Sequence, residues 1–131
     1  MASVCDGEEK LFGERTQIME LACRGPISLD HAEAIPVTVE MAREIVALLG
    51  MNCSHPVHVA EYPVGPDGTS PGFIVVQCLY ESLVYVDVWP RLQAFYLHCA
   101  SCKEFDPEPV WDLLIGRGFA IQDTIKGHLT L

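Results

Sequence analysis

Three β-rich segments follow one another with very little chain between them, and this spacing constrains the fold more than any other feature. They span residues 73–80, 83–89 and 94–99. Strands joined by such short connections pair antiparallel. In the middle segment every second residue from Val84 to Val88 is a valine, so one face of this strand is aliphatic and the other carries larger polar and aromatic side chains. The centre of the chain is therefore predicted to be an antiparallel sheet with one buried face.

The rest of the chain supplies further strands and two helices that can cover this sheet. Strands are predicted over 16–23, 57–62 and 119–125, a helical turn over 28–33 that ends before Pro36, and helices over 39–49 and 106–115. Thr38 is predicted to cap the first helix and Gly50 to end it, and Asp106 to cap the second with Pro107 in its first turn. Gly65-Pro66-Asp67-Gly68 is typical of a turn. This order predicts an α+β fold, a two-layer sandwich whose sheet is mainly antiparallel and whose helices lie on one face.

The 131 residues suit a single domain over residues 15–131, preceded by a polar tail over residues 1–14 that is expected to be flexible. The formal net charge is −10, which argues against nucleic acid or an anionic membrane as a partner because both need a basic surface. The chain has no apolar run long enough to cross a bilayer, and its first ten residues do not resemble a signal peptide. A cytoplasmic location is therefore expected.

Six cysteines lie mostly within apolar stretches rather than in a loop-rich disulfide pattern, so they are predicted to be reduced and largely buried. The local cluster His98-Cys99-Ala100-Ser101-Cys102 leaves three alternatives open. It is half of a zinc site that His55 or His58 would complete, it is a redox pair, or its cysteines serve packing or supply a single functional thiol. The chain lacks a second Cys-x-x-Cys, and no metal is the main expectation.

The segment over residues 72–102 resembles the self-processing region of S-adenosylmethionine decarboxylases of the short bacterial and archaeal type. In that family a β run ends in Glu-Ser-His, the next strand ends in His-Thr-aromatic-Pro-Glu, and the strand after it ends in a catalytic cysteine. This chain has corresponding residues in the same register without a gap: Glu81-Ser82, Trp89-Pro90 and Cys102.

The resemblance implies a self-cleaving decarboxylase of polyamine (spermidine) biosynthesis. Cleavage would fall between Glu81 and Ser82 and would convert Ser82 into a pyruvoyl group, the cofactor that forms a Schiff base with the substrate amine. Cys102 would then return a proton to the carbanion as a general acid. The implied substrate is S-adenosylmethionine, and the implied assembly is a homodimer.

Four positions differ from the family pattern, and they open further alternatives. Leu83 replaces the histidine after the cleaved serine, and Ile74 stands in the register of a second serine used in processing. Asp87 stands where the family has its processing histidine, and a carboxylate can serve as the base there if it is buried. Arg91 replaces a ribose-binding glutamate and suits a substrate with a carboxylate better than a sulfonium. The alternatives are a pyruvoyl decarboxylase of another amino acid and a non-processing relative that acts as a binding or regulatory partner.

Overall fold

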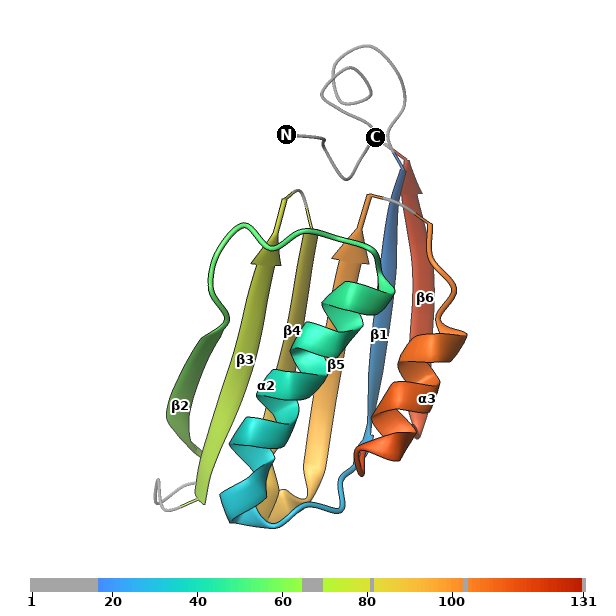
Figure 1. Ribbon diagram of the computed structural model, residues 1–131. Helices are drawn as coiled ribbons and strands as arrows, with labels where there is room; N and C mark the ends of the chain where they lie inside the picture. The colour runs from blue at the N-terminus through green and yellow to red at the C-terminus, as the bar shows by residue number, and fades with distance from the viewer. Residues whose placement is uncertain (1–16, 65–69, 81, 103, 131) are drawn as a thin grey trace.

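The chain forms one six-stranded sheet with two helices packed on the same face (Figure 1). This computed structural model describes residues 17–64, 70–80, 82–102 and 104–130, so the predicted tail and the predicted turn at residues 65–68 lie outside the described residues. The elements are β1 (Gln17–Pro26), α2 (His31–Leu48), β2 (His58–Val64), β3 (Ser70–Leu79), β4 (Ser82–Trp89), the short 3-10 helix η1 (Pro90–Leu92), β5 (Ala94–Ser101), α3 (Glu108–Gly116) and β6 (Asp123–Thr130). The strand order is β2-β3-β4-β5-β1-β6, with every neighbouring pair antiparallel. The predicted α+β sandwich is confirmed.

The core lies between the sheet and the two helices. The alternate valines of β4 are fully buried there, as the sequence predicts. Phe95 of β5 meets Phe119 edge-on, with ring centroids 5.0 Å apart, and Met41 of α2 packs into the same cluster. Among the described residues, no helix is both long and apolar enough to cross a bilayer.

The first helix is longer than predicted because Pro36 does not interrupt it. Helix α2 begins at His31 and continues through Pro36, where the proline lacks only the N–H that would bond one turn back. Thr38 is therefore not a cap: it is buried inside the helix, and its Oγ1 donates to the Ala34 carbonyl at 2.7 Å. Gly50 has a φ of +65° directly after the helix and confirms the predicted left-handed stop.

The last two elements are shifted toward the C-terminus relative to the prediction. Helix α3 begins at Glu108, and its N-cap is Pro107 instead of the predicted Asp106. Asp106 precedes the cap, and its Oδ1 accepts a hydrogen bond from the Glu108 N–H at 3.0 Å. Strand β6 begins at Asp123 instead of residue 119. Phe119 forms an isolated bridge with Ile27 and fills the core, so the chain reaches the edge of the sheet only afterwards.

Neither helix covers the second face of the sheet, which we call the open face. Its centre carries half-buried side chains from two neighbouring strands: Tyr85, Asp87 and Trp89 of β4, and Tyr96 and His98 of β5. These residues alternate with the core residues of the same strands. The open face therefore collects most of the aromatic and titratable side chains of β4 and β5.

Candidate functional site

Two of the predicted site residues meet at one end of the sheet. Strand β4 begins at Ser82, and β5 ends at the residue before Cys102. The two strands pair antiparallel with Leu83 opposite Ala100, so the start of one lies beside the end of the other. Ser82 Oγ lies 4.0 Å from Cys102 Sγ. Register alone thus brings a hydroxyl and a sulfur together from positions 20 residues apart in the chain.

Cys102 takes part in a disulfide bond, so the expectation that all six cysteines are reduced is wrong at this position. Sequence spacing could not reveal this, because a disulfide depends on which chain segments approach one another in space. Cys23, Cys53, Cys78 and Cys99 are free, but the expected burial holds only for Cys23 and Cys99, because Cys53 and Cys78 are exposed. Any acid or base role of Cys102 therefore requires that this disulfide be reduced first.

The local cluster of His98 and the Cys-x-x-Cys does not converge on one point. His98 and Cys99 are neighbours in a strand, so their side chains lie on opposite faces of the sheet. Cys99 is fully buried, and this burial raises the pKa of its thiol to about 12. Among the residues that the structure describes, no three His, Cys, Asp or Glu side chains gather as a metal site. The described residues therefore do not bring Cys99 and Cys102 together with a histidine.

Asp87 lies in the middle of the open face, and its carboxylate accepts a hydrogen bond from a tyrosine. Tyr62 Oη donates to Asp87 Oδ1 at 2.8 Å. The tyrosine comes from β2, two strands away, and it reaches the carboxylate past Gly72, its partner on β3, which has no side chain. Burial first, and then Asp87, raises the pKa of Tyr62 to about 12. Sequence reasoning missed Tyr62, because only the strand order shows that it can reach Asp87.

A single chain does not gather all the predicted residues into one cluster. Asp87 follows Ser82 by five residues along β4, which corresponds to about 17 Å of extended strand. Arg91 lies farther still, in η1 at the opposite end of β4, and is exposed. Ile74 pairs with Asp87 from β3 on the open face. Glu81 lies outside the described residues. Ser82 and Cys102 thus form one half of the predicted site, and Asp87 and Arg91 lie apart from it.

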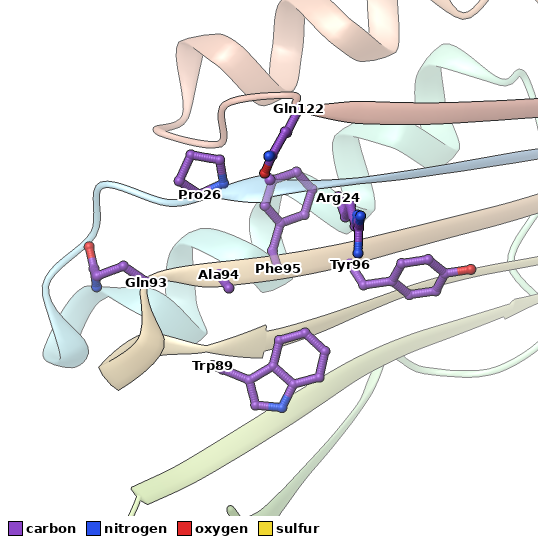
Figure 2. Close-up of a pocket in the computed structure, with 9 residues that line it drawn as sticks. Arg24, Pro26, Trp89, Gln93, Ala94, Phe95, Tyr96 and Gln122 are labelled. Atoms are coloured by element: carbon purple, nitrogen blue, oxygen red, sulfur yellow. The ribbon is translucent and has the colours of Figure 1, made fainter.

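A pocket of about 680 Å³ lies near the Arg91 end of the sheet (Figure 2). The small side chain of Ala94 lies between the larger ones of Trp89 and Tyr96, and Arg24 of β1 is the direct register partner of Tyr96. Figure 2 shows Arg24 extending from its strand toward Tyr96. The hollow exists because a residue with a single methyl group separates large neighbours. Sequence reasoning did not identify this pocket, whose walls come from segments far apart in the chain.

The turn that borders this pocket is held by a residue in an unusual conformation. Gln93 has a φ of 51°, in the left-handed region that side chains other than glycine rarely adopt. Its Nε2 donates to the Pro90 carbonyl at 2.6 Å and to the Leu29 carbonyl at 3.2 Å. These bonds fix the connection between β4 and β5 at the mouth of the pocket. The sequence does not reveal this turn, because a glutamine gives no indication of a positive φ.

Comparisons with known proteins support the fold. Neither a protein-family profile nor a curated protein matches the sequence of the chain. A solved structure is similar: the crystal structure of the adenosylmethionine decarboxylase from Aquifex aeolicus VF5, with a TM-score of 0.54 and 16% sequence identity. The match covers 87% of this chain and 88% of that one. At this identity the likeness concerns the fold, which spans nearly the whole of both chains.

Proposed function

We propose that the chain is a divergent relative of the S-adenosylmethionine decarboxylases that cleaves itself between Glu81 and Ser82 and decarboxylates an amino-acid substrate. One observation carries the proposal. In a fold similar to that of such an enzyme, Ser82 Oγ lies 4.0 Å from Cys102 Sγ. Self-cleavage requires a nucleophile such as the Ser82 hydroxyl, and reprotonation requires a proton donor such as the Cys102 thiol. Ser82 stands at the start of a strand, next to the connection that would be cut.

The cleavage chemistry needs only water in addition to the chain. The Ser82 hydroxyl attacks the Glu81 carbonyl carbon and displaces the amide nitrogen, so that the peptide becomes an ester. A base removes the Ser82 α-proton, and elimination releases the Glu81 carboxylate and leaves a dehydroalanine. This group tautomerises to an imine, and water hydrolyses the imine to a pyruvoyl ketone and ammonia. The ketone then accepts the substrate amine as a Schiff base and takes up the electrons of decarboxylation.

Cys102 is proposed to act after decarboxylation. A thiol within reach of the former Ser82 is placed to return a proton to the carbanion as a general acid. Because Cys102 takes part in a disulfide in this structure, the proposal requires a reducing environment, such as the cytoplasm that the sequence suggests. We therefore expect turnover to depend on a thiol reductant.

The base is proposed to come from a second copy of the chain. Asp87 is too far along its own strand to reach Ser82, since five extended residues span about 17 Å. It lies on the open face, where Tyr62 orients its carboxylate. Two copies packed antiparallel through their open faces would place the Arg91 end of each sheet against the Ser82 end of the other, and would bring Asp87 of each nearer to the other copy's Ser82 than to its own. A homodimer would also bury the half-exposed aromatic side chains of β4 and β5.

Arg91 bears on the choice of substrate. A guanidinium at this position favours an amino acid with an additional carboxylate, because a sulfonium cation would be repelled. The candidate substrates are therefore S-adenosylmethionine and an acidic amino acid. With S-adenosylmethionine as the substrate, the protein would act in polyamine biosynthesis.

A second candidate function is a non-processing relative that keeps the fold as a binding or regulatory partner. Two observations favour it. Asp87 Oδ1 already accepts a hydrogen bond from Tyr62, and the Cys102 sulfur is held in a disulfide. In this case the chain stays intact, and the open face binds a partner without chemistry.

A co-expression experiment tests both the cleavage and the shared site. Ser82→Ala lacks the nucleophile and Asp87→Asn lacks the proposed base, so each variant expressed alone should remain uncut. When the two are co-expressed with different tags, the Asp87→Asn chain keeps its own Ser82 and receives Asp87 from its partner. It alone should then be cut, with reduced fragments seen by mass spectrometry.

The matched control is Asp123→Asn, which removes a carboxylate from β6 on the same face and should not impair cleavage. Efficient cutting of Asp87→Asn alone would remove Asp87 from the mechanism. Failure of the mixed pair to be cut, with both chains folded and the wild type cut, would contradict the exchange of residues between copies.

A further inference from the structure

The disulfide at Cys102 joins the proposed proton donor to a second sulfur. Cys102 follows the last residue of β5 and is half-buried at the end of the sheet, and its Sγ lies 4.0 Å from Ser82 Oγ. A sulfur in a disulfide carries no proton. The same group is therefore able to donate a proton in one redox state and unable to do so in the other.

The other cysteines of the chain leave one candidate for the second sulfur. The chain has six cysteines. Besides Cys102, the structure describes four that are free: Cys23, Cys53, Cys78 and Cys99. Burial raises the pKa of Cys23 and Cys99 to about 12, so neither forms a reactive thiolate near neutral pH. The sixth cysteine is Cys5, which lies outside the described residues.

The register of β1 brings the start of this strand to the same end of the sheet as Cys102. Met19 of β1 pairs with Ser101, the residue before Cys102, so the chain enters the sheet at Gln17 beside the disulfide. Cys5 precedes Gln17 by 12 residues, and a segment of this length spans at most about 40 Å when fully extended. A link between Cys5 and Cys102 is therefore within reach without any change in the sheet.

We propose that Cys102 and Cys5 form a reversible redox switch that controls turnover without controlling self-cleavage. The inference rests on the proposed function and names its regulation. With the disulfide closed, Cys102 has no thiol proton to return to the carbanion, so turnover stops. The Ser82 hydroxyl is not part of the disulfide, so the chain still cuts itself. The oxidised protein is thus a processed enzyme held inactive, and the disulfide joins its two fragments because Cys5 precedes Ser82 and Cys102 follows it.

The switch closes with a small-molecule disulfide and opens with a small-molecule thiol. Closing converts two thiols into one disulfide and transfers two electrons and two protons to the oxidant, which leaves as thiols; opening reverses this exchange. In a reducing compartment, such as the cytoplasm expected from the sequence, disulfides are usually transient or redox-sensing. Cys102 is only half-buried, so its sulfur is accessible to such a reagent, unlike the fully buried sulfur of Cys99.

The first measurement maps the disulfide in the full-length chain. The protein is equilibrated with oxidised or with reduced dithiothreitol, whose cyclic disulfide leaves no lasting adduct, and free thiols are then alkylated. Peptide mass spectrometry without further reduction should find Cys5 linked to Cys102 in the oxidised sample and both alkylated in the reduced one. Ser82→Ala, which cannot cut itself, should form the same link, so this result does not depend on self-cleavage.

The second measurement compares turnover in the two redox states. Carbon dioxide release is followed from S-adenosylmethionine and from glutamate, the probes for the two candidate substrates. Oxidation should lower turnover by about 100-fold or more, the contribution of one general acid, while the cut fraction stays the same, and reduced dithiothreitol should restore it. Cys5→Ser should keep full turnover in the oxidised buffer. The matched control is Cys53→Ser, which removes an exposed free thiol and should respond to oxidation as the wild type does.

The proposal is overturned if Cys102 is alkylated in both buffers, or if its peptide is linked to any cysteine other than Cys5, including Cys102 of a second copy. It is also overturned if Cys5→Ser loses turnover on oxidation, or if the linked protein turns over as fast as the reduced one. A chain that stays uncut in both buffers contradicts the proposed function, and with it the control of turnover. The mapped link then still decides whether Cys5 and Cys102 form a redox pair.

Discussion

At the scale of single residues, two buried thiols make the stability of the protein depend on pH. Cys23 and Cys99 are 2% and 0% exposed, and burial raises the pKa of each from 9.0 to about 12. Below pH 9 the thiols are protonated in both the folded and the unfolded chain, so this contribution to stability is complete. Above pH 9 the unfolded thiols ionise while the folded ones do not. The free energy of unfolding should therefore fall as the pH rises from 9 toward 12.

Urea unfolding at several pH values from about 8 to about 11 measures this effect, and each thiol should contribute a slope of at most about 1.4 kcal/mol per pH unit. Cys99→Ala should make the slope shallower, whereas Cys53→Ala, which alters an exposed thiol, should leave it unchanged. An identical slope in the two variants would contradict the assignment to buried thiols.

The sequence allowed some residue contacts to be predicted and left others hidden, for a physical reason. The antiparallel pairing of β4 with β5, which brings Ser82 close to Cys102, was predicted from consecutive strands with a short connection, whereas the shared role of the two residues was implied only by the family resemblance. The contact of Tyr62 with Asp87 spans three strands, and that of Arg24 with Tyr96 joins the first strand to the fifth. Such contacts depend on strand order, which local patterns do not encode.

At the scale of elements, one glycine allows β1 to meet the segment that leads into β6. A Cβ on Gly25 would lie 1.8 Å from the Ala120 carbonyl oxygen, which is backbone and cannot move aside cheaply. Hydrogen bonds on either side hold the two segments together: the Ala120 N–H donates to Pro26 O at 2.9 Å, and the Gln122 N–H donates to Arg24 O at 2.8 Å. This close approach also sets the position of Gln122 at the pocket.

Gly25→Ala should therefore destabilise the fold by about 1–3 kcal/mol or more, in the range of overpacked sites. Gly127→Ala is the matched control, since a Cβ there would meet nothing within 4 Å. It should be neutral or slightly stabilising, because it restricts the unfolded chain. Thermal unfolding of the two variants measures the difference, and equal melting temperatures would show that the Gly25 contact is not tight.

Element boundaries could be predicted only where a local signal ends a segment. Gly50 stops α2 as predicted, because a positive φ favours glycine wherever it occurs. Pro36 did not act as a boundary, since its position near the start of α2 costs one hydrogen bond and the packing of Met41 and Ile45 against the sheet outweighs that loss. Strand β6 begins late because Phe119 is drawn into the core.

At the scale of the whole molecule, the proposed mechanism needs residues from both ends of the sheet, and a second copy of the chain would supply those of the far end. Ser82 and Cys102 occupy one end of the sheet, and Arg91 and the pocket occupy the other. A single chain cannot close this distance, whereas two chains packed in opposite directions would place each end against the other. The open face, with its half-buried aromatic side chains, is the surface that such an assembly requires.

Self-cleavage at Ser82 can be tested by measuring the intact mass of freshly purified protein under denaturing, reducing conditions. Self-cleavage predicts two fragments, residues 1–81 and residues 82–131, with the second carrying a pyruvoyl group in place of its amino terminus. Reduction is essential, because a disulfide at Cys102 can hold fragments together. A single uncut chain of 131 residues would contradict self-cleavage and favour the non-processing relative.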